Sequence, residues 1–355
     1  MNIWQRYFYK EYLFTIIFLL FSIYGLYVIV DIMAHLKVAT DSKSSLLILI
    51  EYYLSTFSKR LDVLIPFSIL IATIRTLYNF QSKGELVAML ASGISRLELL
   101  KPFLIVAASF SLLLYANYEW VLPSALSNIA TIAETRFGKE QDSFEIKKPQ
   151  EVMLQDGSKL IYSSFKRSDK TFHDVFWIRS ADSIFHMKTL SCSGSPPCGK
   201  WVDEITRNSS GLLETTRSVE NYDFKDMRFD LHALKNSIVV PQELSLWELV
   251  KQSWLYFDSS SPRAAEVKAY LVYKLTFPWM CLLAFIAPAP FCMRFTRMMP
   301  ILMTYLVAIA GLFCMSILLQ TALSIARHQL LAPYFAIGIP WLVALYYFGK
   351  PYLRL

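Results

Sequence analysis

The chain has 355 residues, of which 55% are hydrophobic and 15% aromatic, with a net charge of +7 and a mean hydropathy of +0.38. These values exceed those of an ordinary soluble domain, and the charged residues gather in the middle of the chain, between long uncharged runs near both ends. The composition therefore excludes a purely water-soluble globular protein and predicts a membrane protein with a polar central domain.

Six apolar runs predict six transmembrane helices, because about 18 or more apolar residues are enough to cross a bilayer. The runs cover residues 12–30, 61–80, 102–118, 275–293, 298–326 and 329–349. The second run contains Asp62 and Arg75, but both lie near its ends, where charged groups reach the lipid headgroups. We therefore expect two groups of three helices, residues 1–127 and 263–355, separated by the polar domain.

The distribution of basic residues predicts the orientation of these helices. With six crossings both termini lie on one side, and the short loops on that side hold more lysine and arginine than the loops opposite. The richer set is Arg6, Lys10, Arg75, Lys83, Arg96, Lys101, Arg294, Arg297, Lys350 and Arg354; the poorer is Lys37, Lys43, Lys59, Arg60 and Arg327. The positive-inside rule then places both termini in the cytoplasm and the central domain in the periplasm.

The central domain, residues 128–262, has mainly strand signals. Asp156 and Gly157 form a hairpin dipeptide between two β-prone runs, and "TFHDVFWIRS" (171–180) alternates apolar and polar residues. Near its end, Ser245 and Glu248 form a capping box that predicts a short helix over 246–257. We expect an all-β domain of jelly-roll or sandwich type that ends in a short helix.

Two of the five cysteines lie in this domain, and they are close in the sequence. Cys192 and Cys198 flank "SGSPP", a turn-like segment in a compartment that favours oxidation. A local disulfide between them is one expectation, and two free thiols in a loop is the alternative.

Signals for enzymatic chemistry are weak. "GSPPCGK" (194–200) imitates a phosphate-binding loop, but the next residue is Trp201 where a serine or threonine is needed, so we expect ATP to be hydrolysed by a separate subunit. The five histidines show no metal-ligand spacing. Asp31 and His35 share a helix face and form the best acid–base pair, which also fits a polar pair at headgroup level.

The segment between the second and third runs predicts a short amphipathic helix, residues 83–94. Leu86, Met89 and Leu90 recur at helical spacing, Glu85 suits the positive end of a helix dipole, and Gly93 fits a C-terminal stop. Two interpretations stay open at this point. The helix lies flat on lipid, or it inserts into a cytoplasmic partner as the coupling helices of ABC transporters do.

The same segment carries a family resemblance. "GELVAMLASGIS" (84–95) resembles a signature of the lipopolysaccharide-export permeases LptF and LptG, also called the YjgP/YjgQ family. "RYFYKEYL", "LIPFSILIATI" and the order of "SLWELV" before "YLVYKLTFPWMCLLAFIAPAPFCMRFTR" are similar to further family patterns. "YKLTFP" (273–278) and "VDIMAHLK" (30–37) favour the LptG branch over LptF.

The resemblance implies a permease subunit that is not itself an enzyme and that binds no cofactor or metal. It implies ATP and Mg²⁺ use by two copies of a cytoplasmic ATPase, LptB, and pairing with the sister permease. It also implies handover of lipopolysaccharide to periplasmic LptC and LptA, contact with membrane lipids, and no nucleic acid partner. Alternatives that the residues leave open are an envelope scaffold and a membrane-embedded enzyme acting on lipid headgroups.

The resemblance further implies two groups of functional residues. The ATPase-coupling residues are Gly84, Glu85, Leu86, Ala88, Met89, Ala91, Ser92, Gly93 and Ile94. Candidates for binding the phosphates of the lipid headgroup are Lys37, Lys59, Arg60, Arg136 and Lys139.

Overall fold

A computed structural model gives the fold as two compact units, one formed by Met1–Gly138 with Pro241–Leu355 and the other by Lys139–Val240. We describe each unit by itself. The described residues are 3–34, 46–136, 150–153, 158–166, 171–180, 182–191, 196–208, 211–224, 241–255, 262–293 and 301–350.

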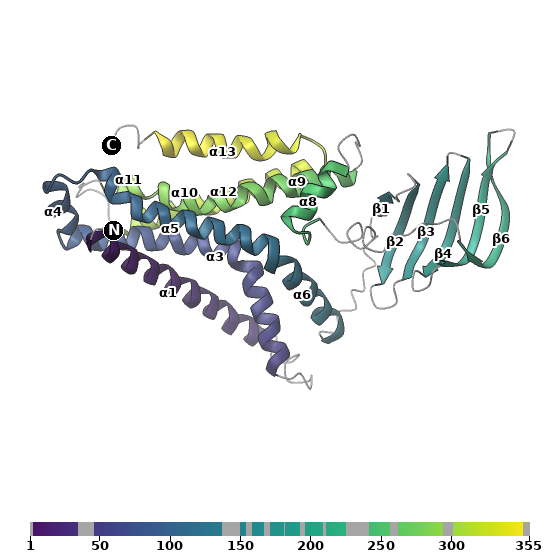
Figure 1. Cartoon of the computed structure of the whole chain (residues 1–355), viewed down its shortest axis with the longest axis horizontal. Coiled ribbons are helices and arrows are strands. Elements are labelled where there is room, and N and C mark those ends of the chain that lie inside the picture. The colour runs from purple at the N-terminus through teal and green to yellow at the C-terminus, as the bar shows by residue number, and fades with distance from the viewer. Residues whose placement is uncertain are drawn as a thin grey trace. The chain divides into compact units, whose positions relative to one another are not determined.

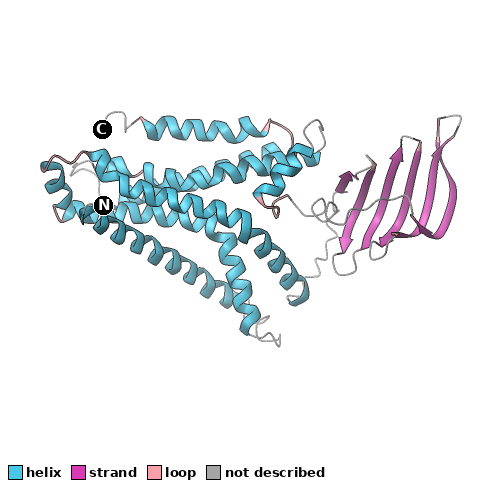
Figure 2. Cartoon of the chain, in the orientation of Figure 1, coloured by secondary structure: helices cyan, strands magenta, loops and turns pink. Residues whose placement is uncertain are grey.

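The first unit is helical (Figures 1 and 2). Its N-terminal part contains α1 (Ile3–Ala34), α3 (Leu46–Ser82), α4 (Glu85–Ala91), α5 (Arg96–Ala116), the π-helical turn η1 (Asn117–Val121) and α6 (Leu122–Arg136). Its C-terminal part contains α8 (Leu246–Leu255), α9 (Pro262–Thr276), the 3-10 turn η2 (Phe277–Trp279), α10 (Met280–Ile286), α11 (Ala289–Cys292), α12 (Ile301–Arg327) and α13 (Pro333–Gly349).

Five stretches of the described helices are long and apolar enough to cross a membrane, and the sixth predicted crossing is a shorter helix. The five are Trp4–Ala34, Leu49–Ser82, Arg96–Ile129, Pro262–Cys292 and Ile301–Arg327. The sixth, α13, has 17 residues, a length of about 26 Å. It begins at Pro333 and not at 329 as predicted, because Ala332 is extended and the proline takes the first helical position.

The second crossing is the longest helix of the unit. α3 has 37 residues and extends well before the predicted run, and Figure 1 shows it bending along its length. Pro66 lies inside this helix and lacks the N–H that would bond to the carbonyl of Asp62, four residues earlier. A proline at this position accounts for the bend.

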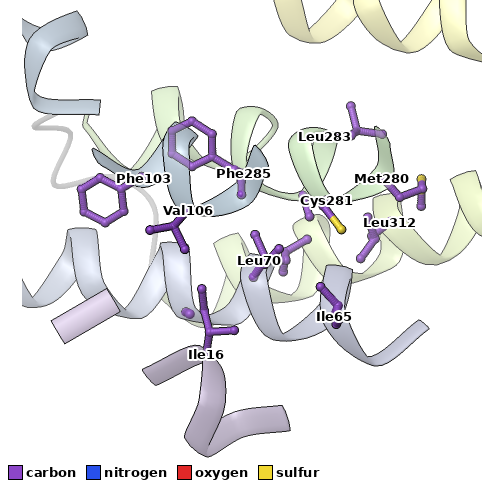
Figure 3. Close-up of a cluster of buried hydrophobic side chains, with 14 of the residues drawn as sticks. Ile16, Ile65, Leu70, Phe103, Val106, Met280, Cys281, Leu283, Phe285 and Leu312 are labelled. Carbon is purple, nitrogen blue, oxygen red and sulfur yellow. The ribbon is translucent and has the colours of Figure 1, made fainter. Parts of the chain in front are cut away.

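One hydrophobic core joins the N-terminal and C-terminal helices. Figure 3 shows Ile16, Leu70 and Phe103 facing Phe285 and Leu312, which come from α1, α3, α5, α10 and α12. The rings of Phe103 and Phe285 stack with their centroids 6.2 Å apart and 2° between their planes. The two groups of three helices therefore form one folded unit rather than two halves with separate cores.

The second unit is a single antiparallel sheet of six described strands. The strands are β1 (Gln150–Met153), β2 (Lys159–Lys166), β3 (Thr171–Ser180), β4 (Ser183–Ser191), β5 (Cys198–Arg207) and β6 (Leu213–Asp223). Each strand pairs with its sequence neighbour, in the order β1-β2-β3-β4-β5-β6 (Figure 1). The predicted β domain is confirmed, and so is the antiparallel pairing of β1 with β2 around Asp156 and Gly157, which themselves lie outside the described residues.

The described strands follow one another in sequence order, and the jelly-roll type of the whole domain stays a prediction. A jelly roll needs Greek-key connections between two sheets, whereas the described strands form an up-and-down meander. Short turns between neighbouring strands explain this order, since each strand meets the next one along the chain first. The short helix predicted at the end of this domain is α8, and it belongs to the helical unit, where it packs against α9 and η1.

The alternation predicted for 171–180 is interrupted once. The register of β2 with β3 passes from Tyr162–Val175 to Ser164–His173 and skips Asp174, whose φ is 52°. Ser163 opposite Asp174 is skipped as well, so the register is the same on both sides, and Phe172, Val175 and Trp177 all lie on the buried face of the sheet although their spacing breaks the alternation. The strand thus retains a continuous apolar face at the cost of one residue in a left-handed conformation.

Asp174 makes two polar contacts on the opposite face, and they predict a pH effect. Its carboxylate accepts a hydrogen bond from Ser163 Oγ (2.9 Å) and lies 3.0 Å from Nε2 of His186. The bond to His186, followed by that to Ser163, holds the pKa of Asp174 below its usual value. A carboxyl with a lowered pKa stabilises the fold above its unfolded pKa of about 3.9, and this stabilisation disappears as the pH falls below that value.

We therefore expect Asp174→Asn to remove part of the acid sensitivity of the sheet. The effect should stay below about 1 kcal/mol, because the Asp174 side chain is 59% exposed and solvent screens its interactions. Hydrogen exchange of β3 and β4, corrected for intrinsic rates, measures the difference between neutral pH and about pH 3. Equal pH profiles for the variant and the parent protein would contradict this assignment.

Candidate functional site

The helix α4 is delimited by two glycines in the left-handed conformation. Gly84 precedes it with φ 74° and Gly93 follows it with φ 91°. At the C-terminal end, the N–H of Gly93 donates to the carbonyl of Leu90 (3.1 Å) and the N–H of Ile94 donates to that of Met89 (3.3 Å). This pair of bonds is a Schellman motif, which satisfies the last carbonyls of the helix and ends it sharply. The predicted glycine stop is confirmed.

The next helix starts immediately after this stop. Ser95 is extended, and its hydroxyl accepts a hydrogen bond from the N–H of Glu98 (3.2 Å), which caps α5. Only four residues, 92–95, therefore separate the end of α4 from the start of α5. Such a short, capped connection holds α4 in a fixed orientation.

The two faces of α4 have different roles. Leu86 is fully buried, and Met89 and Leu90 pack against the core of the helical unit. The opposite face exposes Val87 (47%) together with Ala88, Ala91, Ser92 and Gly93. Helices that lie on lipid combine large apolar residues with many lysines and arginines, and the exposed face of α4 has neither. Its small side chains instead suit the close approach of another protein surface.

Figure 1 shows α4 at one end of the helical unit, and α1 begins and α13 ends at that same end. The helix α8 lies at the opposite end. This arrangement agrees with an even number of crossings. It places the candidate coupling residues on the same side as both ends of the helical unit.

Of the five candidate headgroup residues, the structure describes the side chains of Lys59 and Arg60. Both are exposed on α3, and the guanidinium carbon of Arg60 lies 5.2 Å from the centroid of the Tyr27 ring on α1. Arg136 is the last residue of α6, and Lys37 and Lys139 lie outside the described residues. Arg60 of α3 thus contacts Tyr27 of α1. That all five residues together bind the lipid headgroup stays a prediction.

The predicted acid–base pair of Asp31 and His35 lies only partly within the described residues. Asp31 accepts a hydrogen bond from the hydroxyl of Tyr53 (3.1 Å), and its predicted partner His35 lies outside the described residues. Among the residues that the structure describes, no group of three or more metal-ligating side chains comes together.

Only one of the two cysteines of the predicted disulfide, Cys198, is among the described residues. Cys198 is the first residue of β5, and burial, followed by the neighbouring Asp223, raises the pKa of its thiol. Cys192 lies outside the described residues, so the disulfide stays a prediction.

A polar joint that the sequence analysis missed holds the start of α8. Lys274 of α9 is buried, and its ammonium donates to the carbonyls of Gln242 (2.9 Å) and Leu244 (2.6 Å). Glu119 of η1 accepts a hydrogen bond from the N–H of Trp247 (3.1 Å). Lys274 is the one charged residue between Lys268 and Arg294. This isolation in the sequence could have indicated that Lys274 has a structural role.

The predicted capping box forms within this joint. The hydroxyl of Ser245 accepts a hydrogen bond from the N–H of Glu248 (3.2 Å), and Glu248 accepts one from the N–H of Ser245 (3.1 Å). The reciprocal bonds start α8 at Leu246, as expected.

Replacing Lys274 by methionine should loosen this joint. Methionine retains the apolar stem but leaves the two carbonyls without their donor, at a cost of about 1–3 kcal/mol. We expect a lower unfolding temperature in detergent and faster proteolysis close to residues 241–245. The control is Lys268→Met on the same helix, where Lys268 is half-buried. Equal stability of the two variants would contradict a structural role for Lys274.

The helical unit also contains an apolar cavity of about 240 Å³. Its lining includes Leu70, Leu283, Phe291, Met303, Gly311 and Phe348, from α3, α10, α11, α12 and α13. Such a lining offers hydrocarbon contacts and few polar ones, which suits an acyl chain better than a polar metabolite.

These features define a multi-pass membrane protein with an inserted antiparallel β domain. The chain matches the family model described as lipopolysaccharide export system permease LptF/LptG over residues 6–349, and it belongs to this family. Comparison with curated proteins gave no match. The chain is therefore a lipopolysaccharide export permease of the inner membrane, in a family of transporter subunits rather than enzymes. The family resemblance is confirmed, and the LptG branch stays a prediction because the match covers LptF and LptG together.

Proposed function

We propose that the chain is one permease subunit of an ABC transporter that extracts lipopolysaccharide from the inner membrane. It passes the lipid to a periplasmic bridge of LptC and LptA for export to the outer membrane. The chain pairs with its sister permease, LptF if this chain is LptG, and two copies of LptB hydrolyse ATP with Mg²⁺ in the cytoplasm. The permease itself binds no cofactor.

The geometry of α4 carries this proposal. A seven-residue helix fixed by Leu86 on one face and offering small side chains on the other is suited to seating in a groove of a partner. Because Schellman and capping bonds hold both its C-terminal end and the start of α5, a push on α4 passes directly into the third crossing. In the orientation that the positive-inside rule predicts, α4 and both termini are cytoplasmic and the β domain is periplasmic.

The exposure of α1 and α12 supports pairing with a second permease. Only 17% of the most apolar window of the α1 span and 11% of that of α12 are buried within the chain, against 56% for the α3 span. Two such faces offer apolar surface both to a partner subunit and to lipid chains. Lys37, Lys59, Arg60, Arg136 and Lys139 would face the phosphates at the periplasmic rim.

A continuous apolar route is a physical requirement for this activity. For a lipid with on the order of 60 methylenes, moving the acyl chains from the membrane into water would cost roughly 50 kcal/mol of free energy. The apolar face of the sheet includes Tyr162, Val175 and Met187, which are at most 1% exposed in this structure, and it would supply hydrocarbon contacts beyond the membrane once it opens to the lipid.

Photo-crosslinking of the lipid in cells tests the proposal. A photoreactive residue replaces Phe185, which lies on the apolar face of the sheet and is 8% exposed. A matched probe replaces Phe176, 37% exposed on the opposite face, and a third replaces Lys59 on α3. We expect ATP-dependent lipopolysaccharide adducts at Phe185 and Lys59 and few at Phe176. Absence of adducts at both Phe185 and Lys59 would favour a scaffold over a permease.

A further inference from the structure

The helix α8 is held on one side and open on the other. Leu249 is fully buried, and Leu246 packs against the core of the helical unit. The opposite face exposes Trp247 (71%), Val250 (39%) and Trp254 (83%). These residues are three and four positions apart, so they form one stripe along the helix.

The stripe has a third tryptophan beside it. Trp120 of η1 is 75% exposed, and it directly follows Glu119, the residue that binds the N–H of Trp247. Lys251 is exposed next to the stripe. Three of the eight tryptophans of the chain thus gather at the α8 end of the helical unit.

The depth of this group in the membrane follows from helix geometry. Lys101 is the last charged residue before the uncharged run 102–118, so it marks the headgroup level at the α4 end. Trp120 lies 19 positions further along the same continuous span, a rise of about 29 Å. The hydrocarbon layer is about 30 Å thick, so Trp120 lies at the opposite headgroup level.

A second measure gives the same level for α8. Lys274 of α9 directly precedes the uncharged run 275–293, which continues through α10 and α11, and its ammonium donates to the carbonyls of Gln242 and Leu244, just before α8. Two spans therefore hold the start of α8 at the boundary between hydrocarbon and water.

We propose that the tryptophan stripe of α8, with Trp120, lies in the headgroup layer of the leaflet at the α8 end. Indole rings combine a large apolar surface with one N–H donor, and they favour this layer. Lys251 beside the stripe suits lipid phosphates. The occupant is the lipid surface, and α8 thereby anchors the start of α9 at a fixed depth. This inference depends on the membrane location and not on the proposed transport cycle.

Fluorine NMR of the full-length protein in lipid nanodiscs tests the proposal. All tryptophans carry 5-fluorotryptophan, and Trp→Phe substitutions assign the signals. One sample contains a phospholipid with a spin label near the headgroup, and the other a water-soluble paramagnetic reagent. Trp201, which is 61% exposed in the β unit, is the control for contact with water, and Trp177, at 2%, is the control for burial.

We expect the labelled lipid to remove the signals of Trp247 and Trp254 while the water-soluble reagent spares them. Trp201 should show the opposite response, and Trp177 should respond to neither reagent. If Trp247 and Trp254 respond like Trp201, the stripe faces water and is free for a protein partner, which overturns the proposal. A response like that of Trp177 also overturns it, because the stripe would then be covered by the chain itself.

Discussion

Replacing Gly93 by valine is expected to stop lipid export while leaving the membrane helices folded. Gly93 has φ 91°, in the left-handed region. A residue with a Cβ is destabilised there by about 1–2 kcal/mol, and a β-branched residue by more. The Schellman bonds at the end of α4 would weaken, and the population of the correctly oriented helix would fall roughly 5- to 30-fold. ATP-dependent release of lipopolysaccharide from reconstituted vesicles measures the effect.

Two matched variants separate this backbone effect from a loss of folding. Gly338→Val lies within α13, where a Cβ meets no atom within 4 Å and φ is ordinary, so export should persist. Gly93→Asn should retain more activity than Gly93→Val, since asparagine tolerates the left-handed conformation. Full export by Gly93→Val would show that the orientation of α4 does not matter.

Replacing Trp177 by alanine is expected to unfold the β unit. Trp177 is 2% exposed, its indole N–H donates to Ser158 Oγ (2.9 Å), and its ring stacks on Phe185 with centroids 5.3 Å apart. Removing a buried tryptophan costs about 3–5 kcal/mol, and Ser158 would lose its donor. Limited proteolysis of the full-length protein should cut within the strands, while the helical unit, which has its own core, stays intact.

The control for this variant is Trp201→Ala in the same sheet. Trp201 is 61% exposed, so its removal should change stability by less than about 0.5 kcal/mol. Equal resistance of both variants to protease would contradict the assignment of Trp177 to the core.

The sequence predicted those features that depend on local patterns. The uncharged runs predicted the positions of the membrane helices. Gly93 predicted the end of α4, and Ser95 predicted the start of α5. Ser245 and Glu248 placed the start of α8. Each of these signals acts through neighbours three or four positions away, which a sequence shows directly.

Features that depend on distant contacts were not predicted. The burial of Lys274 depends on carbonyls about 30 positions earlier, and the capping of Trp247 depends on Glu119 in another crossing. The order of the described strands depends on which strands pair, and alternation alone does not determine pairing. The functional residues of α4 came from family resemblance, because small exposed side chains carry no chemical signature of their own.

The most direct test of the central claim is crosslinking from Ala91 in cells. Ala91 lies on the exposed face of α4, and a photoreactive residue there contacts whatever covers that face. The control probe replaces Val250 at the opposite end of the helical unit. The account predicts a covalent adduct between the Ala91 probe and a nucleotide-binding ATPase subunit, and none from Val250. Adducts of the Ala91 probe with phospholipid alone would contradict it.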